Sequence, residues 1–164
     1  MMPEHKRTEL VIQIKRAFKK VPFPGNKIGD KDELTEFLGK SWEAVKFDDL
    51  NSSSGFLLWF SSNALAYYLQ AYMVAILEHP EKVTNTVKEN LVRYLGGDDL
   101  KPDGFRKICS QEQQDMVLQF LLNLQYDDVY PSSPRKLNPG LLRIVAKRKA
   151  EYDKMWNQAI DYWK

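Results

Sequence analysis

The sequence predicts an all-α fold: a single compact domain of about six helices packed around a buried central helix at about residues 62–78. Three observations support this prediction. One long stretch is apolar and free of charge. The segments before and after it repeat apolar residues every three or four positions, and no hairpin signal competes with them. Together they indicate amphipathic helices whose apolar faces meet on one central helix.

The central helix lies in the most apolar part of the chain, Phe56–Leu77, which reads FLLWFSSNALAYYLQAYMVAIL. Its inner part has apolar residues on all sides, as expected for a helix that is buried nearly all round. Ser61 or Ser62 is expected to cap the first turn. His79-Pro80 is expected to end the helix, because proline disfavours helical geometry in the residue before it. Whether Phe56–Phe60 is helix, strand or loop stays open.

The same stretch is long enough to span a membrane, which takes about 20 apolar residues. Its middle, however, holds two serines, an asparagine, a glutamine and three tyrosines. Their polar atoms would lack partners in lipid. Asp48, Asp49 and Glu78 flank the stretch where basic anchors would be expected. We therefore expect a buried helix of a soluble protein and no membrane partner.

Two helices are predicted before the central one. Residues 4–20 place an apolar stripe on one face, and the sequence VPFPGN then breaks the helix. Asp30 and Glu33 have the spacing of a capping box at the start of a short helix over Lys31–Leu38, which Gly39 ends. The stripe of the first helix consists of Leu10, Val11, Ile14, Ala17, Phe18 and Val21.

Three more helices are predicted after the central one. The first carries a stripe over residues 83–95, and the second starts at the capping box Ser110–Gln113. The last starts at Asn138-Pro139, a capping residue before a proline at the first helical position. Between the second and third lies YDDVYPSSPRKLNPG, an irregular stretch of about fifteen residues, which is long enough in a compact domain to suggest a role. The stripe of the last helix includes Leu142, Val145, Tyr152, Trp156, Ala159 and Trp163.

Composition bounds the setting of the protein. A chain of 164 residues is most simply one domain, residues 1–164. Its net charge of +2, from 24 basic and 22 acidic residues, provides no general attraction to nucleic acid or anionic membranes. One cysteine excludes an intrachain disulfide and fits a reducing compartment. No apolar run follows the charges of MMPEHKRTEL, so no signal peptide is expected. We expect a cytoplasmic protein.

One block of the central helix, Tyr67–Met73, reads YYLQAYM. It resembles the central segment of an uncharacterised family of small bacterial proteins, which typically reads YYLPAYM. The chain has Gln70 where the family has proline, so a helix broken in the family is expected to run straight through in this protein. The resemblance implies a bacterial, cytoplasmic setting and no assigned activity. It extends to Ile14–Phe18, Gly39–Trp42, the Gln113-centred box leading into Phe120-Leu121, and Tyr162-Trp163.

Residues suited to catalysis are few. Cys109 directly precedes a predicted helix, where a thiol pKa can be lowered, and a pair with His79 is conceivable. The alternative, which we favour, is that Cys109 is a small buried hydrophobe. The chain has no G-x-S-x-G, P-loop or G-x-G-x-x-G motif, and no H-x-x-x-H, C-x-x-C or E-x-x-H spacing. We expect no cofactor and no metal, and favour a role without catalysis.

A candidate ligand pocket follows the central helix. Asn63, Tyr67 and Gln70 form a narrow polar line, and Tyr68 and Tyr72 share a neighbouring face. Aromatic rings with a few amides are typical of small-molecule sites. The alternative is that the tyrosines carry their rings into the core and satisfy their hydroxyl groups locally.

The strongest basic patch comprises Arg143, Lys147, Arg148 and Lys149 on the last helix. Acidic residues follow it directly, and no aromatic residues are interleaved with it. We therefore expect no nucleic-acid partner.

Two classes of function remain. The first is a non-enzymatic protein-binding domain, most concretely an immunity-type inhibitor of a bacterial toxin. The second is a small-molecule-binding module or a cryptic enzyme that uses the Asn63/Tyr67/Gln70 line. For the first class, the irregular stretch is the expected contact surface, unless its tyrosines simply pack back onto the helices. Its candidate contact residues are Tyr126, Asp127, Asp128, Tyr130 and Arg135.

Overall fold

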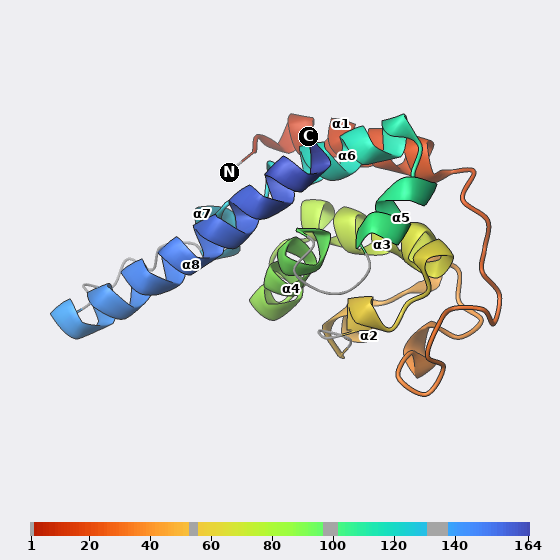
Figure 1. The fold of residues 1–164 in the computed structure, drawn as a ribbon, viewed down its shortest axis with the longest axis horizontal. Helices are drawn as coiled ribbons and strands as arrows, with labels where there is room; N and C mark the ends of the chain where they lie inside the picture. Colours follow the sequence, from red (N-terminus) through yellow and green to blue (C-terminus); the bar gives the residue numbers. More distant parts are fainter. Residues whose placement is uncertain (1, 53–55, 97–101, 131–137) are drawn as a thin grey trace.

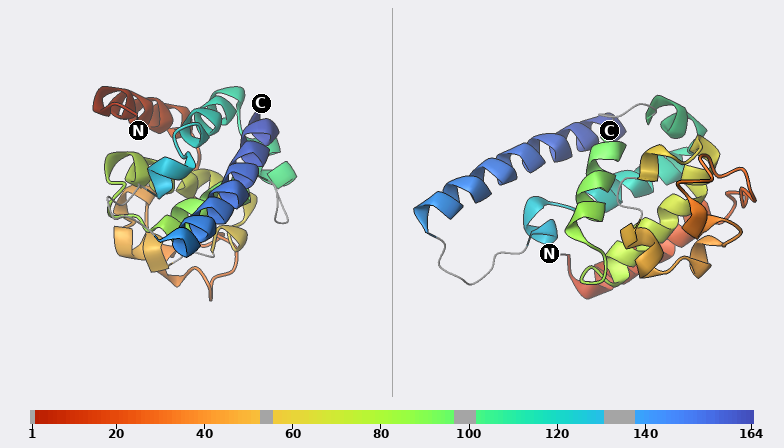
Figure 2. Two further views of the ribbon diagram at one scale, coloured as in Figure 1. Left: turned by 90° about the vertical axis from the view of Figure 1, so that its left-hand side faces the viewer. Right: turned by 90° about the horizontal axis from the view of Figure 1, so that it is seen from below.

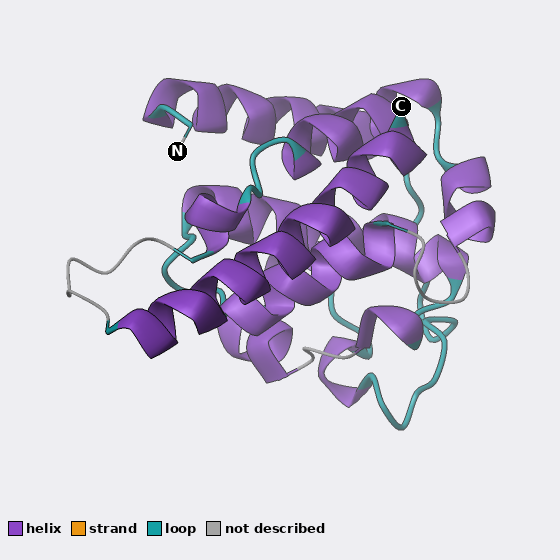
Figure 3. Ribbon diagram, turned by 60° about the vertical axis from the view of Figure 1, so that its left-hand side comes forward, coloured by secondary structure: helices purple, strands orange, loops and turns teal. Residues whose placement is uncertain are grey.

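The computed structural model describes residues 2–52, 56–96, 102–130 and 138–164. Within these ranges the chain forms helices and turns with one isolated β-bridge and no strand, so the all-α prediction is confirmed (Figures 1 and 3). Three single turns of 3-10 helix, η1 (Thr35–Phe37), η2 (Trp42–Ala44) and η3 (Phe56–Leu58), accompany the α-helices. The α-helices are α1 (Glu4–Phe18), α2 (Phe47–Ser52), α3 (Ser62–Glu78), α4 (Asn85–Leu95), α5 (Pro102–Ile108), α6 (Gln111–Leu121), α7 (Tyr126–Val129) and α8 (Pro139–Trp163).

Helix α3 is the predicted central helix, and its bounds agree with the expected ones. Every side chain from Ala64 to Leu77 is buried, apart from the half-buried Ala75. The Ser61 hydroxyl caps the first turn by accepting a hydrogen bond from the Ala64 backbone N–H at 3.3 Å. The helix runs through Gln70 without a break.

The other helices surround α3 in an order set by their apolar stripes. Helix α1 packs against α3 and α6, while α8 packs against α4, α6 and α7 (Figure 1). Residues Leu10 to Phe18 bury the apolar stripe of α1 as predicted. The capping box at Ser110 is also present: its hydroxyl accepts from the Gln113 N–H, and the Gln113 side chain accepts from the Ser110 N–H. Local sequence signals therefore place most of the long helices correctly.

The predicted short helix over Lys31–Leu38 is wrong. Residues 31–33 form turns, and only η1, Thr35–Phe37, is helical. The Asp30 carboxylate does not form the predicted capping box. It instead accepts from the Asp32 N–H at 3.1 Å, which closes a local turn.

The reason for this difference is a tertiary contact with the segment before α3. Gly29 forms an isolated antiparallel bridge with Phe60, and the Asp30 N–H donates to the Trp59 carbonyl at 3.0 Å. Gly29 has φ of 122°, and a Cβ atom there would lie 1.9 Å from the Trp59 carbonyl oxygen. Only glycine allows this approach. The open stretch Phe56–Phe60 is thus the 3-10 turn η3 followed by the bridge.

The prediction of an irregular stretch after α6 is wrong for its first four residues, which form α7. Residues 131–137 lie outside the described ranges. Helix α8 begins as predicted: the Asn138 side-chain oxygen accepts from the Leu141 N–H at 2.9 Å, and Pro139 occupies the first helical position.

Candidate functional site

The most unusual surface of the described chain is the first half of α8. This half extends beyond the other described helices, whereas the second half lies across them (Figures 1 and 2). It also exposes four neighbouring aliphatic side chains: Leu141 by 45%, Leu142 by 52%, Ile144 by 64% and Val145 by 39%. The prediction of a packed stripe along the whole helix is therefore wrong for Leu142 and Val145. The helix is longer than the surface against which it packs.

The exposed aliphatic residues face in the same direction as the buried part of the helix. Leu141 and Ala159 are separated by about five turns at 3.6 residues per turn, so their side chains leave the same face. Val145 and Tyr152 lie within about 40° of that direction. Ala159 and Tyr152 are buried. The exposed group of Leu141, Leu142, Ile144 and Val145, which we call the α8 apolar face, continues the core stripe past the edge of the domain.

A polar and aromatic cluster holds α8 where it leaves the domain. The Tyr130 hydroxyl donates a short hydrogen bond to the Glu89 carboxylate on α4 and accepts one from the Arg148 guanidinium at 2.7 Å. That guanidinium also lies over the Tyr130 ring, 4.4 Å from its centroid. Burial, and then the hydrogen bond to Glu89, raises the pKa of Tyr130 to about 12. The hydroxyl is therefore protonated and able to donate at neutral pH.

A second contact of the same kind lies beside it. The Lys149 ammonium is 4.9 Å from the centroid of the Tyr126 ring and 3.5 Å from both carboxylate oxygens of Asp127. The Tyr126 ring is buried and packs edge-on against Tyr152 of α8 at 5.7 Å. These contacts fix the direction in which the first half of α8 points.

The predicted contact residues of the 126–136 segment therefore do not form one group. Tyr126, Asp127 and Tyr130 come together and bind α8. Asp128 is half-buried and lines a separate pocket, and Arg135 lies outside the described residues. These contacts fit the alternative that the two tyrosines pack back onto the helices. Direct contact of this segment with a partner stays a prediction.

The candidate ligand pocket along α3 consists largely of side chains with partners inside the protein. The Tyr68 hydroxyl lies 3.1 Å from the Phe37 carbonyl and 2.7 Å from the Lys40 carbonyl. Burial raises the pKa of Tyr68 to about 12. The Tyr67 hydroxyl accepts from the Trp42 N–H at 3.3 Å.

The other three residues of that candidate pocket do not converge on one space. The Gln70 amide is buried and donates to a carbonyl of its own helix, that of Tyr67, at 2.9 Å. Tyr72 is buried with its ring near Phe37, and Asn63 is exposed. These contacts resemble core packing more than an empty binding site. A ligand at these residues stays a prediction.

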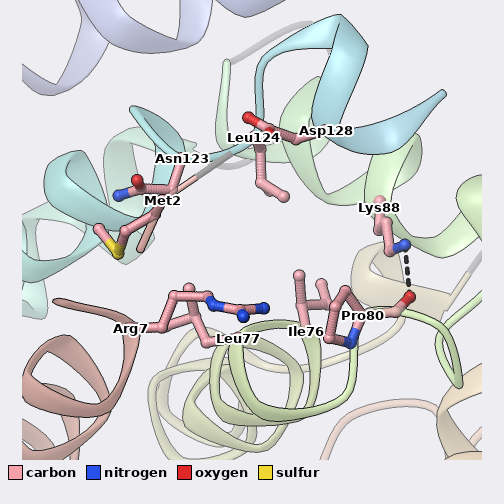
Figure 4. Close-up of a pocket in the computed structure, with 9 residues that line it drawn as sticks. All are labelled: Met2, Arg7, Ile76, Leu77, Pro80, Lys88, Asn123, Leu124 and Asp128. Carbon is pink, nitrogen blue, oxygen red and sulfur yellow. Dashed lines mark hydrogen bonds between the residues drawn. The ribbon is translucent and has the colours of Figure 1, made fainter. Parts of the chain in front are cut away.

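The structure also forms a pocket that the sequence did not suggest, lined by residues of α1, α3, α4 and α7 and of the segments just before α1, after α3 and before α7 (Figure 4). Its polar side chains are Arg7, Lys88, Asn123 and Asp128. Arg7 and Lys88 are 81 positions apart in the sequence, and each occupies an ordinary helical position. No spacing rule links them, so only the tertiary structure brings them to one cavity.

The chain offers little to a nucleophilic mechanism. Cys109 is buried, and burial raises the pKa of its thiol to about 12, so the thiol is neutral near pH 7. His79 is exposed, with Nδ1 3.8 Å from the Glu81 carboxylate and its ring edge-on to Phe47. Among the described residues, no group of three or more His, Cys, Asp or Glu side chains could hold a metal ion.

Comparisons of the chain with protein-family models, curated proteins and solved structures found no match. None of the helices in the described ranges is long and apolar enough to cross a membrane. The interpretation of function therefore rests on the surfaces described above.

Proposed function

We propose that this protein is a non-enzymatic protein-binding domain whose α8 apolar face inserts into a groove of another protein. One observation carries the proposal: four adjacent aliphatic side chains are 39–64% exposed on a helix that extends beyond the domain. Contiguous exposed apolar surface of this kind marks interaction sites more often than scattered apolar residues do. An amphipathic helix seated in an apolar groove is a recurring mode of recognition.

The energy available at this face is substantial. Fully burying one such aliphatic side chain contributes about 1.5–3 kcal/mol. Because about half of each side chain is still exposed, covering the four would contribute roughly 3–6 kcal/mol in all. Association itself costs several kcal/mol in lost motion, so a stable complex also needs contacts around the helix.

Charge indicates which partner would supply these contacts. Residues 139–151 contain four cations (Arg143, Lys147, Arg148 and Lys149) and one carboxylate (Glu151). Glu89 and Asp127 pair with Arg148 and Lys149, so the local net charge is +1. Charge therefore does not attract two copies of this segment to each other. A groove with an apolar floor and acidic residues at its rim would complement both properties of the helix.

The direction of the face argues against a flat partner such as a lipid surface. The α8 apolar face shares its direction with the buried stripe of the same helix, so it looks toward the side on which the domain lies. The domain itself would obstruct a plane placed against this face. A compact protein that enters the corner between the free half of α8 and the domain would not be obstructed.

Site-specific photo-crosslinking in the native host tests the proposal. A photoreactive residue at Ile144 should yield one predominant protein adduct, while the same residue at the exposed position Arg143, opposite the centre of the α8 apolar face, should not. The captured partner, once purified, is then titrated with the unmodified protein, with Ile144→Gln and with the matched control Ala146→Gln. We expect affinity to fall about tenfold for Ile144→Gln and to change less than about twofold for Ala146→Gln.

Three results would contradict the proposal: crosslinks only between copies of this chain, crosslinks only to lipid, or a captured partner that binds Ile144→Gln as tightly as the unmodified protein. An immunity-type inhibitor remains the most concrete member of this class. It requires that the captured partner be toxic when produced alone and that co-production of this protein relieve the toxicity.

A further inference from the structure

The pocket between α1 and α4 contains two cations that the proposed protein-binding role does not use. Arg7 reaches into it from α1, and Lys88 enters from the opposite side (Figure 4). Asn123 and Asp128 form another wall, and Ile76 and Leu124 contribute apolar surface. None of the described residues that line the pocket belongs to α8, so it is a site separate from the α8 apolar face.

The position of the Lys88 ammonium costs folding free energy, because a charged group is buried there. Its side chain is 95% buried, since only 5% remains exposed, and burial lowers the pKa of its ammonium. Among the described residues, the ammonium donates to the Pro80 carbonyl at 2.6 Å, and the charge of Glu81 also acts on it. It has three protons to donate, and a neutral carbonyl compensates only part of the cost of burying a charge.

Arg7 is half-buried and has a smaller deficit, confined to one atom. Its Nε atom is buried and has no hydrogen-bond partner among the described residues. Unsatisfied buried donors are rare in native proteins, and an unfilled ligand site is one physical explanation.

We propose that this cavity is a binding site for a small anion with a carboxylate or phosphate group, held by Arg7 and Lys88. Two cations face one carboxylate, Asp128, which has an interaction of its own. An anion would therefore lie on the Arg7 and Lys88 side. Guanidinium groups bind carboxylates and phosphates through charge-assisted hydrogen bonds, often in pairs.

The size and walls of the cavity limit the ligand. Its volume is about 50 Å³, and one water needs roughly 10–15 Å³ on this measure, so a group of a few heavy atoms fits. A nucleotide does not fit as a whole. The apolar side chains Ile76 and Leu124 suit a short aliphatic carboxylate, and inorganic phosphate has a similar charged end.

Titration of the ¹⁵N-labelled protein with inorganic phosphate and, separately, with propionate tests the site, with potassium chloride at equal ionic strength as the reference. We expect saturable amide shifts around residues 7, 77–79, 88 and 123–124 with at least one of the two anions. The anion that binds more tightly distinguishes a phosphate ligand from a carboxylate ligand.

Variants assign these shifts to the cavity. Arg7→Gln should weaken binding about tenfold or more, the loss expected for one charge-assisted hydrogen bond. Arg16→Gln, which removes an exposed guanidinium from the same helix, should change affinity less than about twofold. Arg7→Lys keeps the charge but loses Nε, and should fall between them. Lys88→Gln repeats the test if it folds, and Arg7→Gln decides it otherwise. Shifts that do not saturate, that chloride reproduces, or that Arg7→Gln leaves unchanged would overturn the proposal.

Discussion

The same substitution at two leucines should have opposite consequences, because one lies at the centre of the core and the other on the free half of α8. Leu69 is fully buried in α3, whereas Leu142 is 52% exposed. Both are in helices, so Leu→Ala changes helix propensity equally at the two positions and by little. The comparison therefore isolates tertiary burial.

The expected magnitudes follow from what each side chain loses. At Leu69 the change removes buried methyl and methylene groups and leaves a cavity, which together cost about 2–5 kcal/mol of unfolding free energy. At Leu142 no enclosed cavity forms and only part of the transfer energy is lost, so the cost should be below about 1 kcal/mol.

Urea denaturation followed by circular dichroism at a helical wavelength measures both values. The dependence of free energy on urea should stay the same in the two variants, which shows that the same surface unfolds. A loss below about 0.5 kcal/mol at Leu69 would show that α3 is peripheral. A loss at Leu142 as large as that at Leu69 would show that the first half of α8 packs on the domain in solution, and would remove the basis of the proposed function.

Three further predictions concern single groups. Asn138→Ala should destabilise the first turns of α8 by about 1 kcal/mol, because it removes the cap of this helix. Hydrogen exchange should then be faster at the amides of the first turns only, and an equal increase along the whole of α8 would contradict the prediction. Burial raises the pKa of Tyr68 and Tyr130 from 10 to about 12 in the folded protein, so the stability that they contribute is complete below pH 10 and is lost as the pH rises toward 12. The absorbance of tyrosinate should therefore show tyrosines that titrate well above pH 10. Titration of every tyrosine near pH 10 would refute this. Cys109 should react slowly with iodoacetamide in the folded protein and quickly in urea, because its thiol is buried with a pKa of about 12; equal rates would place it at the surface.

Elements with a complete local signal were predictable from the sequence. Ser61, Ser110 and Asn138 are followed by helices that their side chains cap, so both the position and the cause of these starts were visible. The candidate sites were predictable only in part. Tyr126 and Tyr130 do come together, but their partners on α4 and α8 could not be inferred from spacing.

Short elements depend on contacts made far away in the chain. Helix α7 has only four residues, too few to be stable without packing. The helix expected over Lys31–Leu38 fails because Gly29 is bridged to Phe60, a pairing across a separation that a local pattern does not contain. Capping signals predict a helix start only where the neighbouring chain is free to continue as a helix.

The sequence by itself determined the all-α class, the central buried helix and the stripes of the long helices, because each of these depends on residues within one or two turns of each other. Only the tertiary structure decided which part of an apolar stripe packs against another helix and which part stays exposed to solvent. Val145 and Tyr152 belong to the same helical face, yet one is exposed and the other buried, since α8 is longer than the surface beneath it. The same applies to Arg7 and Lys88: their meeting at one cavity follows from the packing of helices and not from any pattern within them.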